Sequence, residues 1–219
     1  MTAKEYISAS RVPWGLFGPE KEFAGDGYRL WTIRQVKLNN TMDWEMTGFT
    51  SMTMLLCYNL RDWNTINNPD CVMEDSKTEL SKHLPAIIRA HGNVLVTGLG
   101  LGCVVRGLLA NPKVDHIDVV EKDRGILNVV GPEFAKNSRV TLHHADALKF
   151  HVRGKLWDLA WHDLHVFGDG LQLLHARLMK KYRYHVGIQG AWDYPRTFAK
   201  VSSKSLGQIL GSPKYRVKA

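Results

Sequence analysis

The stretch NVLVTGLGLGCVVRG, residues 93–107, decides how this chain is interpreted. A short β-branched run typical of a buried strand leads into glycines at three alternate positions, Gly98, Gly100 and Gly102, and an apolar helical pattern follows. Without a Cβ, the backbone can turn sharply and a ligand can approach closely. The first N–H groups of the following helix favour an anion or another acceptor. The pattern is typical of a nucleotide cradle, although a lone motif of this kind also fits a tight strand-to-helix turn.

Strand-like and helix-like patterns alternate from residue 93 onward. We expect strands at 93–98, 114–123, 138–148, 156–167 and 184–192, and helices at 103–112, 124–134 and 170–182. Such alternation implies a parallel sheet with right-handed crossovers. The predicted fold class is therefore α/β with a mostly parallel sheet.

The first 75 residues have a different pattern. Strand-like runs at 28–38 and 49–59 are separated by a turn-rich segment, and residues 64–70 are expected to form a loop. We therefore predict a small β-rich N-terminal appendage, residues 1–75, and an α/β domain, residues 76–219. Ser76 and Glu79 have the spacing of a capping box, which predicts a helix start, and Pro85 is expected to kink or restart that helix.

Composition indicates a soluble protein with a substantial core, since 44% of the 219 residues are apolar and 23% are charged. No apolar run approaches the roughly 20 residues that span a bilayer, and the N-terminus has no signal-type apolar region. Three cysteines without CxxC spacing suggest no disulfide framework. These features predict a cytoplasmic protein with no membrane partner.

The net charge of +8 is concentrated at the C-terminal end. Residues 176–219 contain ten lysines and arginines and one acid, Asp193. Such a segment either attracts nucleic acid or forms a solvated surface. No aromatic stacking motif or helix-turn-helix pattern accompanies the charge, which favours the solvated surface.

Two acidic residues at the ends of later strands support a nucleotide-binding interpretation of the glycine motif. Glu121 closes the second predicted strand, where an acid can accept hydrogen bonds from both ribose hydroxyls of an adenosine ligand, although a solvent-facing acid also fits. Asp146 follows the third strand beside Ala147, where its carboxylate can accept a hydrogen bond from an adenine amino group. The third glycine of the dinucleotide fingerprint would fall at Cys103 and is absent, which favours S-adenosylmethionine over NAD.

With these motifs, residues 75–192 resemble the class I S-adenosylmethionine-dependent methyltransferase superfamily, and within it the spermidine-synthase-like branch. The resemblance implies a Rossmann-like methyltransferase fold, S-adenosylmethionine as cofactor, and a homodimer. In "WDLAWHD", Asp163 matches the catalytic aspartate of aminopropyltransferases, and "ELSKHLP", residues 79–85, resembles their "ExxxHxP" stretch. The cofactor-binding residues implied by the resemblance are Gly98, Gly100, Gly102, Glu121, Asp146 and Ala147.

The chain departs from aminopropyltransferases at residues that hold cationic ligands. Leu101 stands where their glycine loop has an aspartate, Lys77 and Thr78 replace a Tyr-His pair, and Val166 replaces a second acid. These losses favour a methyltransferase that uses intact S-adenosylmethionine on an amine or hydroxyl of a small-molecule acceptor. The alternatives are an aminopropyltransferase that uses the decarboxylated cofactor, and a protein that binds the cofactor without turnover.

Asp163 is the candidate catalytic residue because it ends the fourth strand, where open parallel sheets bind ligands. It would orient or deprotonate the acceptor; the alternatives are a cap on the next segment or a ligand of the cofactor's amino group. His162 and His165 are expected on opposite faces of the strand, so no metal site is predicted. Each is expected to be either a surface histidine or a base with a near-neutral pKa.

The segment after the fifth strand carries Trp192, Asp193 and Tyr194, which either cover the substrate or pack. Many methyltransferases continue from this point with two further strands. Here residues 213–219 would supply at most one short strand. The sheet is therefore expected to be trimmed or completed by a partner chain.

Overall fold

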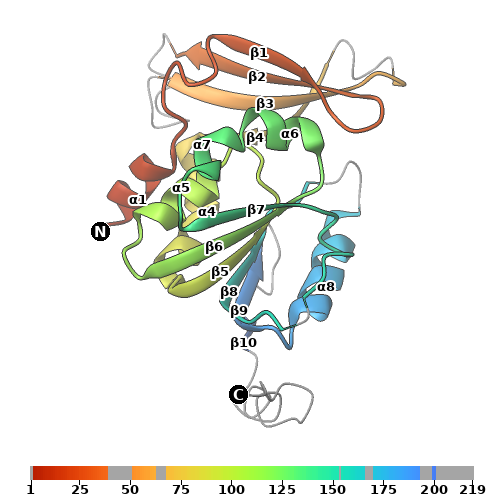
Figure 1. Ribbon diagram of the computed structural model, residues 1–219. Coiled ribbons are helices and arrows are strands. Elements are labelled where there is room, and N and C mark those ends of the chain that lie inside the picture. Colours follow the sequence, from red (N-terminus) through yellow and green to blue (C-terminus); the bar gives the residue numbers. More distant parts are fainter. Residues whose placement is uncertain are drawn as a thin grey trace.

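The computed structural model describes residues 2–38, 51–62, 68–152, 154–165 and 170–192, and the backbone of residues 199–200. A mostly parallel sheet forms the body of the molecule, and a smaller antiparallel sheet lies above one of its edges (Figure 1). The strands of the larger sheet are β5 (Gly92–Thr97), β6 (Val114–Glu121), β7 (Val140–His144), β8 (Trp157–His162), β9 (Val186–Ala191) and β10 (Ala199–Lys200).

The larger sheet has the order β10-β9-β8-β5-β6-β7, in which β10 alone is antiparallel to its neighbour. The chain runs outward from β5 to β7 and then returns to β8 on the other side of β5. Such a reversal is the topological switch point at which doubly wound sheets bind ligands. The predicted Rossmann-like α/β fold with a mostly parallel sheet is thus confirmed.

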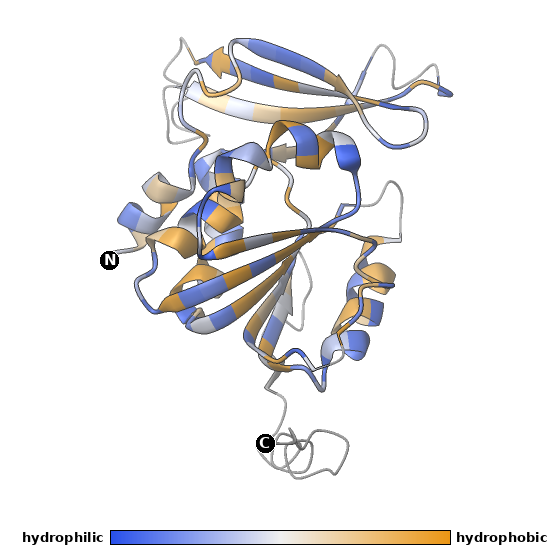
Figure 2. Ribbon diagram, viewed as in Figure 1, coloured by the Kyte–Doolittle hydropathy of each residue, from blue (hydrophilic) through white to orange (hydrophobic). Residues whose placement is uncertain are grey.

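Helices cover both faces of the larger sheet (Figure 1). They are α4 (Lys77–Arg89), α5 (Cys103–Ala110), α6 (Arg124–Val129), α7 (Pro132–Ala135) and α8 (Leu171–Tyr182), with α4 and α5 on one face and α8 on the other. Strands buried on both faces are continuously apolar, and β5 shows this as an orange stretch in Figure 2. Val94 and Val96 enter the cluster beneath α4 and α5, whereas Leu95 enters the cluster beneath α8.

Helix α4 begins as predicted, with the Ser76 hydroxyl accepting a hydrogen bond of 3.2 Å from the N–H of Glu79. Pro85 does not restart the helix, since α4 runs from Lys77 to Arg89 with Pro85 inside it. Proline removes one backbone donor, and burial of Ala86 and Ile87 directly beyond it keeps the last turn in place.

The smaller sheet has the antiparallel order β1-β2-β3-β4. Its strands are β1 (Glu20–Ala24), β2 (Arg29–Lys37), β3 (Ser51–Asn59) and β4 (Asp70–Glu74), and helix α1 (Ala3–Ser10) precedes them. The sequence indicated β2 and β3 but missed the other three elements. β1 is a mostly exposed edge strand without alternating apolar residues, and β4 begins within the predicted loop. A signal for α1 was present, because Thr2 and Glu5 form a capping box.

Asp123 joins the two sheets. Its Oδ2 accepts hydrogen bonds of 3.0 Å from the indole N–H of Trp31 and from the N–H of Asp26, and its Oδ1 accepts one of 2.8 Å from the N–H of Gly125 at the start of α6. One hydrophobic cluster also runs through both sheets. The predicted boundary after residue 75 lies between β4 and α4, and the core crosses it.

We therefore expect Asp123→Ala to lower the free energy of unfolding by about 3 kcal/mol, because it leaves buried donors without an acceptor. Asp26→Ala is the matched control: this exposed residue reaches Asp123 through its backbone N–H, which the substitution keeps. Urea unfolding of the two variants measures the difference. Equal stability of both variants would contradict a joining role for Asp123.

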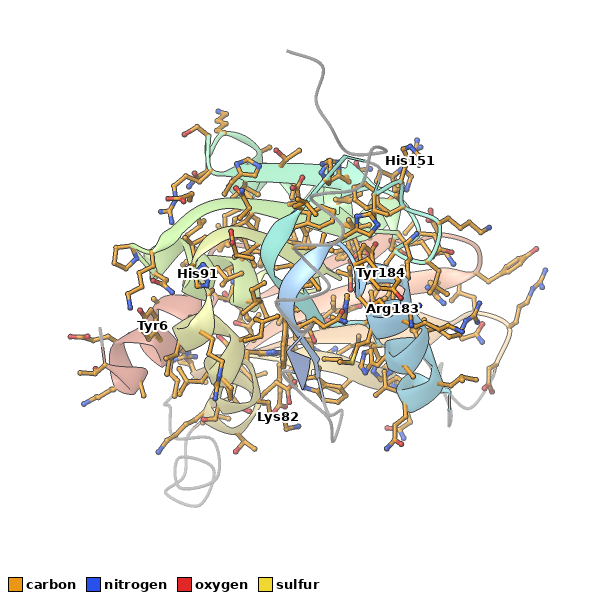
Figure 3. All side chains as sticks on the ribbon, turned by 90° about the horizontal axis from the view of Figure 1, so that it is seen from below. Tyr6, Lys82, His91, His151, Arg183 and Tyr184 are labelled. Carbon is orange, nitrogen blue, oxygen red and sulfur yellow. The ribbon has the colours of Figure 1, made fainter. Side chains whose placement is uncertain are left out.

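The part of the basic end that the structure describes lies near the edge of the sheet opposite the smaller sheet. Lys181 donates hydrogen bonds to the carbonyls of Leu148 and Phe150, and Arg183 lies 4.2 Å from the ring centre of Tyr184. Figure 3 shows this edge, with Arg183 and Tyr184 after α8.

Asp193, Tyr194 and residues 213–219 lie outside the described residues, as does Val166. No helix in the described ranges has the length and hydropathy needed to cross a membrane.

Candidate functional site

A cavity of about 270 Å³ lies between the carboxyl ends of the parallel strands and the smaller sheet. Of the predicted site residues, all except Gly102 line it: Gly98, Gly100, Glu121, Asp146, Ala147 and Asp163. They come from the ends of β5, β6, β7 and β8, which meet here because parallel strands end at the same edge. Trp31, Leu55 and Met73 from the smaller sheet close the opposite wall.

The three glycines of the loop all have positive φ, at 95° for Gly98, 50° for Gly100 and 80° for Gly102. A Cβ on Gly98 would overlap the carbonyl oxygen of Asp163, and one on Gly100 would meet the sulfur of Met73. Gly102 packs against Phe134 and is the N-cap of α5. The loop is therefore a tight turn that also lines the cavity. Gly98 and Gly100 take part in both, whereas Gly102 contributes only to the turn.

Glu121 is a buried acid, with 7% of its surface exposed, and not the solvent-facing acid that the sequence left open. Its Oε2 accepts a hydrogen bond of 2.8 Å from the N–H of Leu99, and its Oε1 accepts one of 2.7 Å from the N–H of Asp123. Burial raises the pKa of Glu121, and these backbone donors oppose the rise. Glu121 thus fixes the glycine loop to β6 while its carboxylate lines the cavity.

The wall after β7 combines one acid with apolar side chains. The Asp146 carboxylate accepts a hydrogen bond of 2.8 Å from the N–H of Leu148, which fixes the turn. Ala147 and Leu148 line the cavity beside Val120 and Leu174. A planar apolar ring with a donor at its rim fits such a wall.

Asp163 follows β8 directly, and its backbone N–H donates a hydrogen bond of 2.8 Å to the carbonyl of Thr97. The side chain is 9% exposed. Burial raises the pKa of Asp163 to about 7, because the charged form loses hydration. A carboxyl group with a pKa near neutrality is suited to accept and release a proton at physiological pH.

Glu79 also lines the cavity, and the sequence had marked it only as part of a capping box and a family motif. Its helix places it one turn from His83, since residues four apart share a face. The Nε2 of His83 lies 3.8 Å from an oxygen of Glu79 and 3.9 Å from an oxygen of Asp163. The sequence signal for this pair was the spacing in "ELSKHLP", which places an acid and a histidine four residues apart on one helix face.

Three other residues that the sequence singled out beside Asp163 have different environments. His162 is fully buried, so its expected position at the surface was wrong. Its Nδ1 lies 3.0 Å from the Thr97 hydroxyl and its Nε2 lies 3.3 Å from Gln189 Oε1, and burial lowers its pKa to about 4. Both nitrogens are engaged, which excludes it as the base. Trp192 lines the cavity, as does His165.

The described residues contain no group of three or more histidines, cysteines or acids that could hold a metal ion.

Part of the sequence is similar to aminopropyltransferases. The chain is 34% identical over 84 residues to the polyamine aminopropyltransferase of Lachnoclostridium phytofermentans, and 33% identical over 79 residues to that of Agathobacter rectalis. The matches cover 35% and 33% of this chain, and only 29% and 28% of those proteins. The predicted resemblance to aminopropyltransferases is thus confirmed over about a third of this chain. No protein-family model matches the chain.

Solved structures with some similarity to this chain include methyltransferases. An S-adenosylmethionine-dependent methyltransferase from Clostridium acetobutylicum has a TM-score of 0.38 and 15% identity, covering 51% of this chain and 48% of that one. Human methyltransferase-like protein 13, in complex with SAH, has a TM-score of 0.39 and 19% identity, covering 51% and 61%. A dimethyladenosine transferase from Plasmodium falciparum has a TM-score of 0.42 and 15% identity, covering 53% and 41%.

Proposed function

We propose that this chain binds S-adenosylmethionine in the cavity and transfers its methyl group to an amine or hydroxyl of a small-molecule acceptor. The observation that carries this proposal is the shared cavity: it joins the glycine loop, Glu121, Asp146 and Asp163 at the switch point of the sheet. Ligands of open α/β sheets bind at this place.

The residues present fit the cofactor along its length. Gly98 and Gly100 would leave room for the methionine end, Glu121 would accept hydrogen bonds from the ribose hydroxyls, and Asp146 with Ala147 would line the adenine, since all five residues line the cavity. The Glu121 carboxylate accepts hydrogen bonds from the backbone of Leu99 and Asp123, and the backbone of Lys122 also contributes. Its two oxygens have about four lone-pair sites in all, which leaves capacity for a hydroxyl.

The bound cofactor would supply an electrophilic methyl group on a sulfonium. The chain's own contribution is to exclude water and to position the acceptor, which accounts for much of the rate in such displacements. Asp163 would accept the proton from the acceptor amine or hydroxyl on its carboxylate, and the side chains of Trp192 and Leu164 would help to close the cavity.

Calorimetric titration with S-adenosylmethionine, decarboxylated S-adenosylmethionine and NAD tests the cofactor. Preference for the intact compound supports the methyltransferase proposal. Binding of NAD alone would overturn it, and binding of none of the three would mean that the glycine loop is only a turn.

Glu121→Gln is expected to weaken S-adenosylmethionine binding about 50-fold, because the amide loses an acceptor site and sets its NH₂ against a backbone donor. Asp115→Asn is the matched control, since Asp115 is an exposed acid on the same strand. The dissociation constants of both variants are measured by the same titration. An unchanged affinity in Glu121→Gln would place the ribose elsewhere.

A second candidate is aminopropyl transfer from the decarboxylated cofactor. The observation that favours it is the pair of carboxylates, Glu79 and Asp163, that lines the same cavity, because cationic amines bind where acids gather. Leu101 opposes it, since its side chain is fully buried in the core and is not part of the cavity wall. Preferential binding of the decarboxylated cofactor in the titration would establish this alternative.

A further inference from the structure

His83 is a buried histidine with one ring nitrogen bonded and the other not. Its Nδ1 lies 3.3 Å from the indole Nε1 of Trp161. An indole N–H can only donate, so Nδ1 must be the acceptor, and the neutral ring carries its proton on Nε2. Among the described residues, Nε2 has no hydrogen-bond partner although it is fully buried.

The Nε2 atom lies within 4 Å of two carboxylates, and its N–H bonds to neither. Glu79 Oε1 lies 3.8 Å from Nε2 and Asp163 Oδ2 lies 3.9 Å from it, and both distances exceed those of a hydrogen bond. Glu79 and Asp163 line the cavity, whereas His83 does not. His83 is therefore behind the site, between the two acids that face a ligand.

The ring acts as a neutral donor. Burial, opposed by Glu79 and aided by the nearby Lys82, lowers the pKa of His83 to about 4. At neutral pH the ring therefore has a single N–H to give and no net charge. The single N–H of His83 can form a hydrogen bond with Glu79 or with Asp163, but not with both at once. A buried donor without a hydrogen bond costs free energy.

We propose that His83 is a positioning residue for Asp163: its Nε2–H bonds the Asp163 carboxylate when that group is ionised, and turns to Glu79 when Asp163 carries a proton. The inference rests on the proposed function for the origin of that proton, which leaves the acceptor amine or hydroxyl and ends on Asp163. His83 keeps its own proton throughout. Its role is to hold the ionised carboxylate in place before transfer and to release it afterwards.

The test is a pH titration of the Asp163 carboxyl carbon by NMR in the full chain without ligand, with ¹³C-labelled aspartate and Asp163→Asn for assignment. His83→Phe removes the donor and is expected to raise the pKa of Asp163 by about one pH unit, since hydrogen bonds to charged groups favour the ionised form. His83→Gln places an amide N–H near the position of Nε2 and is expected to restore the wild-type pKa. A histidine with a merely structural role would change only the melting temperature.

Glu79→Gln tests the exchange between the two acids. Removal of the competing carboxylate is expected to lower the pKa of Asp163, both because a like charge is lost and because His83 then serves Asp163 alone. In the His83→Phe background only the charge effect remains, so the decrease is expected to be smaller. Equal decreases in both backgrounds would overturn the proposal, as would an Asp163 pKa that His83→Phe leaves unchanged.

A measurement on the wild-type chain covers the case in which His83→Phe does not fold. With ¹⁵N-labelled histidine, the His83 Nε2 resonance is expected to show the Nε2–H tautomer and to shift with the same midpoint as the Asp163 carbon. An Nδ1–H tautomer, or no shift at that midpoint, would overturn the proposal. Because neither titration needs S-adenosylmethionine, failure of the cofactor to bind would count against the proposed function alone.

Discussion

Asp163→Asn is expected to slow transfer from S-adenosylmethionine to the acceptor by about 10²–10⁴-fold, because an amide cannot take the acceptor's proton. The affinity for S-adenosylmethionine is expected to stay within about threefold of wild type, since Asn keeps the size of the side chain and one of its oxygens. Radiolabelled methyl transfer to a panel of small amines and alcohols measures the rate, and calorimetry measures the affinity.

Asp158→Asn is the control for this variant, because Asp158 lies on the same strand with 44% of its side chain exposed and outside the cavity wall. A collapse of cofactor affinity in Asp163→Asn would make Asp163 a cofactor ligand and not a base. Full activity in that variant would remove any catalytic role. Cofactor binding without transfer in the wild-type chain across the panel would favour a protein that binds the cofactor without turnover.

The same variant has an expected effect on stability. The pKa of Asp163 is raised to about 7 in the folded chain from its ordinary value of 3.8. The folded state therefore holds the proton more tightly than the unfolded state, and stability falls as pH rises from about 4 to about 7. Asp163→Asn removes this loss, so its melting temperature is expected to exceed that of wild type by about 5 °C at pH 8, with little difference at pH 4. Parallel melting curves would contradict the raised pKa.

Gly98→Ala is expected to destabilise the chain by about 4 kcal/mol and to abolish cofactor binding. The φ of 95° is unfavourable for any residue with a Cβ, and the added methyl group would overlap the backbone carbonyl of Asp163. The two closest atoms belong to the backbone of Asp163, so no flexible side chain can move aside to relieve this overlap. The glycine loop and the end of β8 would therefore have to move apart. Because both segments line the cavity, this movement would disrupt the cofactor site.

Gly154→Ala is the matched control for this substitution. Gly154 also has a positive φ, at 75°, but a Cβ there meets nothing within 4 Å. It is expected to lose only about 1 kcal/mol, which is the cost of the backbone conformation alone. Urea unfolding of the pair separates conformational strain from overlap. If both variants lose the same free energy, the close approach of Gly98 to Asp163 does not limit substitution.

Local patterns in the sequence predicted the five parallel strands of the larger sheet because each carries its own signal, whereas β10, only two residues long, was not predicted. The β-branched run at 93–98 and the three glycines after it predicted β5 and the turn. The pattern also located Glu121 and Asp163 at strand ends, and parallel strands bring their ends to one edge. The smaller sheet was only half predicted, since the exposed β1 has no apolar alternation to detect.

What the sequence determined by itself was the alternation of strands and helices between residues 93 and 192, the glycine turn and the acids at the strand ends, because these depend on spacing along the chain. Tertiary structure decided what surrounds those acids. It buried Glu121 against the N–H of Leu99, and it set His83 between Glu79 and Asp163, which are far apart in sequence. The pKa of Asp163 is near 7 because side chains from distant segments exclude water from its carboxylate. A local sequence pattern cannot predict which distant side chains these are.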